Sequence, residues 1–363
     1  MYRPVMGMLG LHVGLLLLLI LGSALPLLVA CGGQDSATDG KDHMPSAGRA
    51  TETLRIRDST QYMAIGAGSL WLPNASNGTI TRIDLNKSKV VAVIEVSSDP
   101  QSAPFDADPQ SVEVSSNHIW FTDRARKAVS RIDPNTNRIV ERIPVGISPY
   151  DIAIDGDTLW LTDTERGFVA RVDTKENRVV ERFDVGGAAG IIVGSESVWV
   201  AEMGPMVDGP SQLARIDPQT NEIVEEIPLE SSHPQSMAYG AGSVWIANGE
   251  GSCTVSRVDP QTNEEIARIN TGLSMFDVAV GGGSVWAAGD VQNSPGCEES
   301  DEEGALVRID PVVNKVVGRT NVRSALGVAA TDDAVWVSSY FDRGGGVLRG
   351  KATGALTRVE PPR

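Results

Sequence analysis

Oxygen-bearing side chains recur at one fixed spacing and are the first candidates for a metal site. The residues three positions after the seven tryptophans are, in chain order, Asn74, Asp123, Asp163, Glu202, Asn248, Gly289 and Ser339. Carboxylate and amide oxygens are the ligands that Mg²⁺ and Ca²⁺ prefer in proteins. The metal hypothesis therefore names Asp123, Asp163 and Glu202 as ligands. The alternative is that these side chains cap neighbouring loops, and the sequence requires no cofactor.

Histidine is the second candidate for chemistry, because it can act as a general base near neutral pH. The chain has 4 His residues, and only His233 is expected on the same face of the molecule as Glu202. We consider this pair as a catalytic base and a metal ligand, with an ordinary loop histidine as the alternative. No Ser-His-Asp set with a nucleophile motif, Walker loop or CxxC motif is present.

The 3 Cys residues separate into a pair and a single residue. Cys253 and Cys297 fall in corresponding loops of adjacent repeats, so we predict a disulfide between them. A reactive thiol or a metal ligand is the alternative, but no histidine lies near either residue in the sequence. Cys31 stands at the end of an apolar run and has a different role.

The N-terminus has the features of a secretory signal. Arg3 precedes an apolar run from Leu9 to Ala30, which ends in Leu-Val-Ala-Cys. This end resembles the lipobox of bacterial lipoproteins, and the resemblance implies cleavage before Cys31 and its lipidation. An uncleaved transmembrane anchor and a plain secretory signal are the alternatives. We expect a signal peptide over 1–30 and a flexible tether over 31–50. The remainder would stand in the cell envelope, lipid-anchored to a bacterial membrane on its extracytoplasmic side.

One sequence motif appears seven times and positions all of these residues. The tryptophans sit in copies such as GAGSLWL, DGDTLWL and GAGSVWI, at spacings of 49, 40, 39, 46, 41 and 50 residues. Each copy combines an apolar strand, a Gly-rich turn, the Trp strand, an Arg-Ile/Val-Asp strand, an Asp-Pro turn and an alternating strand. Four strands in about 40–45 residues is typical of a propeller blade. We therefore predict an all-β, seven-bladed β-propeller over 51–363, with four antiparallel strands per blade.

The repeated tryptophan and the repeated triplet both have structural explanations. We expect the tryptophans to fill the interfaces between blades rather than to stack on a ligand. In the triplet, the carboxylate can cap the following turn and the arginine can pair with a neighbouring blade. The seventh copy looks decayed, as VLRGKATGALTRVEP. Ring closure is left open, because either the strand at 53–57 or the strand at 355–359 could complete the last blade.

The repeats resemble the seven-bladed propellers known as YVTN or YncE-like, and the virginiamycin B lyase (streptogramin lyase) family, over about residues 60–345. The lyase resemblance implies a His base ten residues before a blade tryptophan, and Mg²⁺ held partly by a Glu three residues after one. The first position holds Gln61, Gln110, Tyr150, Ala189, Gln235, Phe276 and Leu326, none of which is His. At the position three residues after a tryptophan, only blade four has a glutamate, Glu202. We therefore expect binding without catalysis. The alternative is a metal-dependent lyase or hydrolase whose active site has diverged from that of the lyase family.

Charge and loop lengths narrow the choice of partner. The chain has 31 Lys+Arg against 47 Asp+Glu, a net charge of -16, which argues against nucleic-acid binding. Long, variable loops are expected on one face of the ring, at 97–110, 203–212 and 289–304, whereas the turns on the other face are short and uniform. We expect a monomer that binds an envelope protein, a peptide or a glycan through this loop face.

Overall fold

The computed structural model describes residues 44–56, 60–97, 107–115, 118–202, 211–230, 233–249, 251–291, 297, 303–340 and 354–362. The expected signal peptide, Cys31 and the tether up to His43 lie outside these described residues. So do most residues of the three long loops. Within the described ranges, no helix has the length and apolar character needed to span a membrane.

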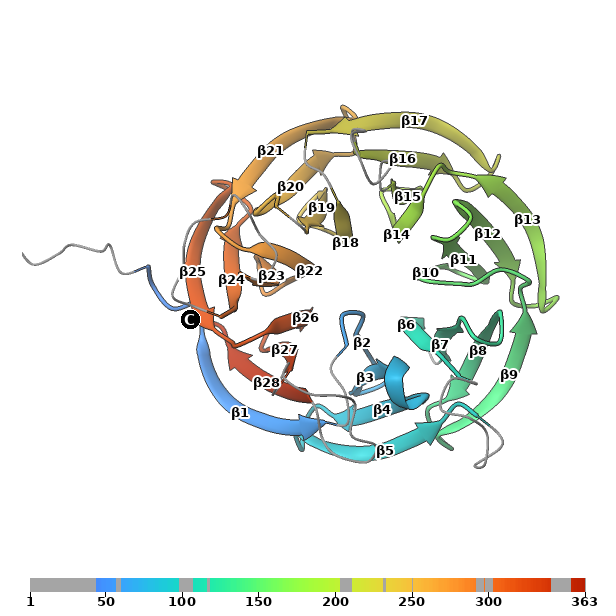
Figure 1. Ribbon diagram of the computed structural model, residues 1–363, viewed down its shortest axis with the longest axis horizontal. Helices are drawn as coiled ribbons and strands as arrows, with labels where there is room; N and C mark the ends of the chain where they lie inside the picture. Colours follow the sequence, from blue (N-terminus) through green and yellow to red (C-terminus); the bar gives the residue numbers. More distant parts are fainter. Residues whose placement is uncertain are drawn as a thin grey trace, which may run out of the picture. The chain divides into compact units, whose positions relative to one another are not determined.

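Seven four-stranded antiparallel sheets form the propeller (Figure 1). Blades one to three consist of β2–β5 (Ala64–Gly66, Ser69–Asn74, Thr79–Asp84, Lys89–Glu95), β6–β9 (Pro109–Ser115, His118–Asp123, Ala128–Asp133, Arg138–Pro144) and β10–β13 (Ile152–Asp155, Thr158–Asp163, Phe168–Asp173, Arg178–Asp184). Blades four to six consist of β14–β17 (Ala188–Gly194, Ser197–Glu202, Ser211–Asp217, Glu222–Leu229), β18–β21 (Pro234–Gly240, Ser243–Asn248, Thr254–Asp259, Glu264–Asn270) and β22–β25 (Ser274–Gly281, Ser284–Asp290, Ala305–Asp310, Lys315–Asn321). Blade seven consists of β26 (Ala325–Ala330), β27 (Val335–Tyr340), β28 (Gly354–Glu360) and β1 (Arg49–Ile56). Apart from the short 3₁₀ turn η1 (Ala75–Asn77), every helix or strand in the described ranges is a strand, which confirms the predicted fold.

Both strands proposed for ring closure take part in it. β1 pairs with β28 in the order β26-β27-β28-β1, so the N-terminal strand is the outermost strand of the last blade and β28 is its third strand. Arg358 lies opposite Trp336, as the triplet arginines do in the other blades. The seventh copy of the triplet is therefore Arg358-Val359-Glu360, and its third strand has not decayed.

The compact unit that contains the propeller includes residues before the predicted boundary at residue 51. Residues from Met44 onward belong to the same compact unit as the ring. The carbonyl of Pro45 accepts a 2.8 Å hydrogen bond from the Arg319 amide, and Ala47 is fully buried. Gly318 makes this packing possible, because a Cβ there would lie 2.7 Å from the Ala47 Cα. The segment 44–48 thus crosses the outer edge of blade six.

The tryptophans, together with the triplet arginines Arg82, Arg171, Arg215 and Arg257, join neighbouring blades. All seven tryptophans are buried; Trp286 of blade six, for example, packs into one cluster with Val335 and Val337 of blade seven. The Arg215 guanidinium lies 5.1 Å from the Trp199 ring centroid and donates a 2.8 Å bond to Asn263 Oδ1 in the following blade. Such a contact combines a cation–π interaction with a charge-assisted hydrogen bond. The structural interpretation of both motifs is confirmed.

The triplet carboxylates cap the turns that follow them. Asp217 Oδ1, for example, accepts a 2.7 Å bond from the Gln219 amide, and Asp259 does the same for Gln261 at 2.8 Å. In blades two, four, five and six the turn then presents an asparagine with a positive φ, such as Asn263 at 57°, to the arginine of the preceding blade. The turn chemistry and the contact between blades therefore depend on one another.

Candidate functional site

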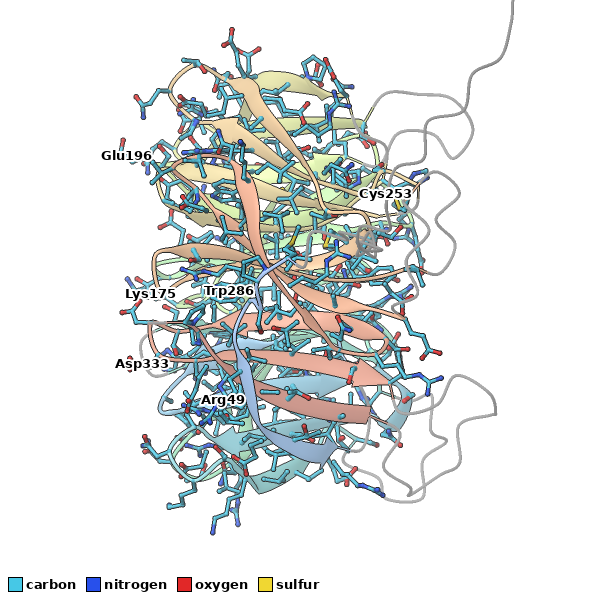
Figure 2. The ribbon with its side chains drawn as sticks, turned by 90° about the vertical axis from the view of Figure 1, so that its left-hand side faces the viewer. Arg49, Lys175, Glu196, Cys253, Trp286 and Asp333 are labelled. Carbon is cyan, nitrogen blue, oxygen red and sulfur yellow. A yellow bond between two sulfur atoms is a disulfide. The ribbon has the colours of Figure 1, made fainter. Side chains whose placement is uncertain are left out.

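The two faces of the propeller carry different connections. We call the face with the connections from the second to the third strand, and from one blade to the next, the loop face; the opposite one is the turn face. Figure 2 shows Cys253 on the loop face and Lys175, Glu196 and Asp333 on the turn face. Cys253 forms a disulfide with Cys297, with Cα atoms 5.5 Å apart, as predicted. It joins the loop regions of blades five and six on the loop face.

The carboxylates proposed as metal ligands bind their own loops. Asp123 and Asp163 are completely buried. Asp123 Oδ2 lies 3.2 Å from Arg126 Nη1, and its Oδ1 accepts the Asp108 amide at 3.2 Å. Asp163 accepts two amides of the following loop and, at 3.2 Å, the Ser148 amide. Capping of neighbouring loops was the alternative interpretation of these residues, and it describes both of them.

Glu202 and His233 are not joined in the structure. Glu202, 6% exposed, lies against Gly186 of the connection between blades three and four, and its Oε1 has no hydrogen-bond partner. Burial, with a smaller effect of Glu226, raises the pKa of Glu202 to about 7. His233 has a φ of 60° and accepts the Gly249 amide on its carbonyl. The hydrogen bonds and ion pairs of the described residues include none between Glu202 and His233. Across the same part of the chain, no three His, Cys, Asp or Glu side chains gather as a metal site would require.

Sequence reasoning missed a ring of residues in the central channel, one position further along the innermost strands. The residues nine positions before the tryptophans lie just before these strands or within their first four residues. We call them the channel ring: Tyr62, Ser111, Asp151, Gly190, Ser236, Asp277 and Gly327. The order Ser-Asp-Gly occurs in blades two to four and again in blades five to seven. This repetition is visible in the sequence once the copies are aligned on their tryptophans.

Each channel aspartate connects three blades. The Ser111 hydroxyl donates to Asp151 Oδ1 at 2.7 Å, and the Ile191 amide donates to Oδ2 at 3.0 Å. In the other half of the ring, Asp277 accepts the Ser236 hydroxyl at 2.5 Å and the Val328 amide at 2.8 Å. The two halves of the channel ring therefore form the same arrangement twice.

The glycines at the third position of each half differ in how closely neighbouring backbone packs against them. At Gly327 a Cβ would lie 2.4 Å from the Thr60 carbonyl oxygen, so the backbone is packed too closely for any side chain. At Gly190 the nearest atom would be 3.6 Å away, which is an ordinary contact. The sequence repeat is thus required by packing in the second half of the ring and is less constrained in the first.

Burial changes the acidity of the carboxyl groups in the channel. It raises the pKa of Asp151 to about 6 and that of Asp277 to about 7. Glu113, on the neighbouring strand β6, has its pKa raised to about 8 by burial and then by the Asp151 charge. Desolvation favours the neutral form of each group. These carboxyl groups therefore change charge near neutral pH.

Aromatic and amide side chains surround the loop-face end of the channel. We call this the mouth; it comprises Tyr62 and the residues ten positions before the tryptophans. The Tyr62 hydroxyl crosses from blade one and lies 3.2 Å from the Tyr150 hydroxyl and 3.3 Å from the Gln235 carbonyl. The two tyrosine rings meet edge to face at 5.6 Å. Arg124 lies 5.9 Å from the Tyr150 ring centroid and pairs with Glu165 at 3.0 Å. Both tyrosines remain partly exposed, so the mouth offers aromatic and hydrogen-bonding groups together.

A cavity of about 330 Å³ lies in the channel next to the mouth. All seven innermost strands contribute to its wall, which includes the three carboxyl groups described above. Apolar groups such as Ile152, Ile191 and Val278 occupy the remaining wall. The cavity therefore combines acidic and apolar surfaces.

Comparison with known proteins identifies the fold and nothing finer. No family model matches the chain, and no curated protein matches it. A chain of Kuenenia stuttgartiensis hydrazine synthase is similar over 90% of this chain and 99% of its own length, with a TM-score of 0.63 and 14% identity. A chain in the crystal structure of the mitotic checkpoint complex is similar over 92% of this chain and 98% of its own, with a TM-score of 0.66 and 7% identity. The propeller is consistent with a scaffold that binds ligands or proteins, and such rings serve many activities. The YVTN and streptogramin lyase resemblance remains a hypothesis.

Proposed function

We propose that this protein is an extracytoplasmic binding module, lipid-anchored through Cys31, whose loop face binds an envelope protein, a peptide or a glycan around the mouth of the channel. The main observation in support of this proposal is the pair Tyr62 and Tyr150, which contact each other across the mouth and are partly exposed. Tyrosines provide large contact area at low conformational cost, especially when they are already fixed in place.

The environment of this pair supports the proposal. Arg124 over Tyr150 and the polar groups of Gln61, Gln110 and Gln235 add donors and acceptors next to the aromatic surface. The disulfide between Cys253 and Cys297 restrains two loops of the same face and lowers the entropy that binding would otherwise cost. The turn face lacks this variety, because its connections repeat the same short turns.

A photo-cross-linking experiment in intact cells tests the proposal. A photoreactive residue at Gln110, in the mouth, should give a defined adduct with one envelope component. The same residue at Val312, 86% exposed on the turn face, should give none. Tyr150→Ala should reduce the Gln110 adduct at least tenfold, whereas Tyr239→Ala, at the opposite end of the channel, should not. Equal adducts from both faces would refute binding at the loop face.

The anchor needs a separate test. Cys31→Ser should move the protein from the membrane fraction to the soluble fraction and abolish incorporation of a labelled fatty acid. Continued membrane association without the label would favour the transmembrane alternative. Because the propeller is unchanged by this substitution, the result is independent of the outcome at the mouth.

A further inference from the structure

The central cavity contains acidic groups without a basic partner. Asp151, Asp277 and Glu113 line it, and none of the described residues in its wall is Lys or Arg. Tyr62 and Tyr239 in the cavity wall, and Tyr150 beside it, are the other titratable groups near them, and none can supply a positive charge. A buried charge is normally paired or neutralised. A cation from solution would therefore complete this site.

The distribution of the carboxyl groups distinguishes between kinds of cation. They come from blades two, three and six rather than from one point. No three acidic, His or Cys side chains converge anywhere in the described part of the chain in the way that a metal ion needs. Apolar wall residues, including Ile191 and Val328, lie between the acidic positions. This pattern suits an elongated organic cation with a hydrocarbon body better than an atomic ion.

The repeated Ser-Asp-Gly arrangement points to two charges on the ligand. Asp151 and Asp277 are three blades apart in a ring of seven, so they face the cavity from well-separated sides. Each is fixed by a serine hydroxyl and a backbone amide of the neighbouring blades. A volume of about 330 Å³ is at the lower end of the range for small-molecule pockets. It would hold on the order of ten water molecules.

From these observations we infer that the central cavity binds a small aliphatic amine, with ammonium groups at Asp151 and Asp277 and its hydrocarbon chain against the apolar wall. This site is separate from the proposed loop-face function. Tyr62 bridges the mouth, whereas the cavity wall continues to Tyr239, 39% exposed, and Ala330 near the turn face. The amine therefore enters from the turn face, and a partner on the loop face need not block it.

The pKa values of the carboxyl groups in the cavity predict that amine binding depends on pH. An alkyl ammonium group stays charged from pH 5 to pH 8, as a lysine does. Asp151 and Asp277 are largely protonated at pH 5 and largely ionised at pH 8. Glu113 remains partly protonated at pH 8. Binding should therefore be at least tenfold tighter at pH 8 than at pH 5.

Isothermal titration of the full chain in detergent tests the inference, with 1,4-diaminobutane as the probe. We expect saturable binding at pH 8, weaker by tenfold or more for n-butylamine, which carries one charge. Asp151→Asn and Asp277→Asn should each weaken diamine binding at least tenfold. Asp333→Asn, which removes an exposed carboxylate on the turn face, should change it less than twofold.

The wild-type protein alone can decide the question if a channel variant fails to fold. The melting temperature should rise with millimolar diaminobutane at pH 8, since a ligand that binds only the native state stabilises it. It should not rise with MgCl₂ at equal ionic strength. No saturable heat and no melting shift at pH 8 would overturn the inference. An equal response to Mg²⁺, or diamine binding independent of pH, would overturn it as well.

Discussion

Replacing Asp277 by asparagine should remove a defined part of the pH dependence of stability. Asp277 is 5% exposed, and it accepts bonds from Ser236 and Val278 on one oxygen and from Val328 on the other. Burial raises its pKa to about 7 from an ordinary value of 3.8. A raised pKa means that the native state binds the proton more tightly than the unfolded state. Its stabilising contribution is therefore complete below pH 4 and is lost as the pH rises through 7.

The size of the effect follows from the pKa. Between pH 5 and the native-state pKa of about 7, Asp277 holds its proton in the native state but not in the unfolded state. This interval covers two pH units. At about 1.4 kcal/mol per unit, the wild type loses roughly 3 kcal/mol of stability over this range through Asp277 alone. Asp277→Asn cannot ionise, but its amide group faces the Val328 N–H and loses one hydrogen bond, at a cost of about 1–2 kcal/mol. The variant should be less stable than the wild type at pH 5 and equally or more stable at pH 9.

Urea unfolding followed by tryptophan fluorescence at pH 5, 7 and 9 measures this difference directly. The matched control is Asp333→Asn, which removes an exposed carboxylate without changing the channel. The difference in unfolding free energy between wild type and Asp277→Asn should shift by about 3 kcal/mol across the range, as the linkage requires. A difference that stays constant with pH would refute the reasoning. It would mean that the three hydrogen-bond donors hold Asp277 ionised throughout.

Three further predictions concern the loops, the channel backbone and metal ions. Cys253→Ala should lower the unfolding free energy by up to about 4 kcal/mol in non-reducing urea titrations, because its disulfide closes a loop of 44 residues. The wild type in reducing agent should lose a similar amount, and no loss in either case would contradict a stabilising role. Gly327→Ala should cost more than about 2 kcal/mol in the same assay, whereas Gly190→Ala should cost less than about 1 kcal/mol, because only the Cβ added at position 327 clashes with backbone. Equal costs would show that the channel backbone relaxes freely. Adding Mg²⁺ or Ca²⁺ after EDTA should leave the melting temperature unchanged, because Asp123 and Asp163 already accept bonds from their own loops; a clear rise would restore the metal hypothesis.

The fold was predictable because each sequence repeat contains the residues that form the repeating contacts. A tryptophan in every blade and an arginine opposite it form the contacts between blades, so their period determines the number of blades. The exception was blade seven, whose triplet Arg358-Val359-Glu360 has glutamate in place of aspartate. No alternating strand follows this triplet, because β1 from the N-terminal part of the chain pairs with β28 instead. The earlier start at Met44 was hidden because Pro45 to Gly48 have no strand pattern of their own.

The site was less predictable, because side-chain direction decides it. Asp123 and Asp163 have the right residue type and spacing for a ring of ligands, but both turn into their own loops. The lyase resemblance predicts a functional residue ten positions before each tryptophan, which is Tyr150 in blade three. The aspartate that lines the cavity, Asp151, is the next residue. Neighbouring residues here have different surroundings, so a shift of one position separates a residue of the mouth from a residue of the channel. Only the repeated Ser-Asp-Gly order could have identified Asp151 and Asp277 in advance.

The joining of β1 to β28 also has a consequence for the biogenesis of the protein. Thr53 and Thr357 lie with their hydroxyl oxygens 3.2 Å apart, although 304 residues separate them in the chain. Closing so large a loop is entropically unfavourable and becomes possible only when the last strand has been synthesised. During synthesis, β1 must therefore remain unpaired while the first six blades assemble. A chain truncated before Gly354 would expose β27 and β1 as open edges, which are sites for aggregation. Closure of the ring therefore requires β28, since a nascent chain that lacks this strand can complete every blade except the last.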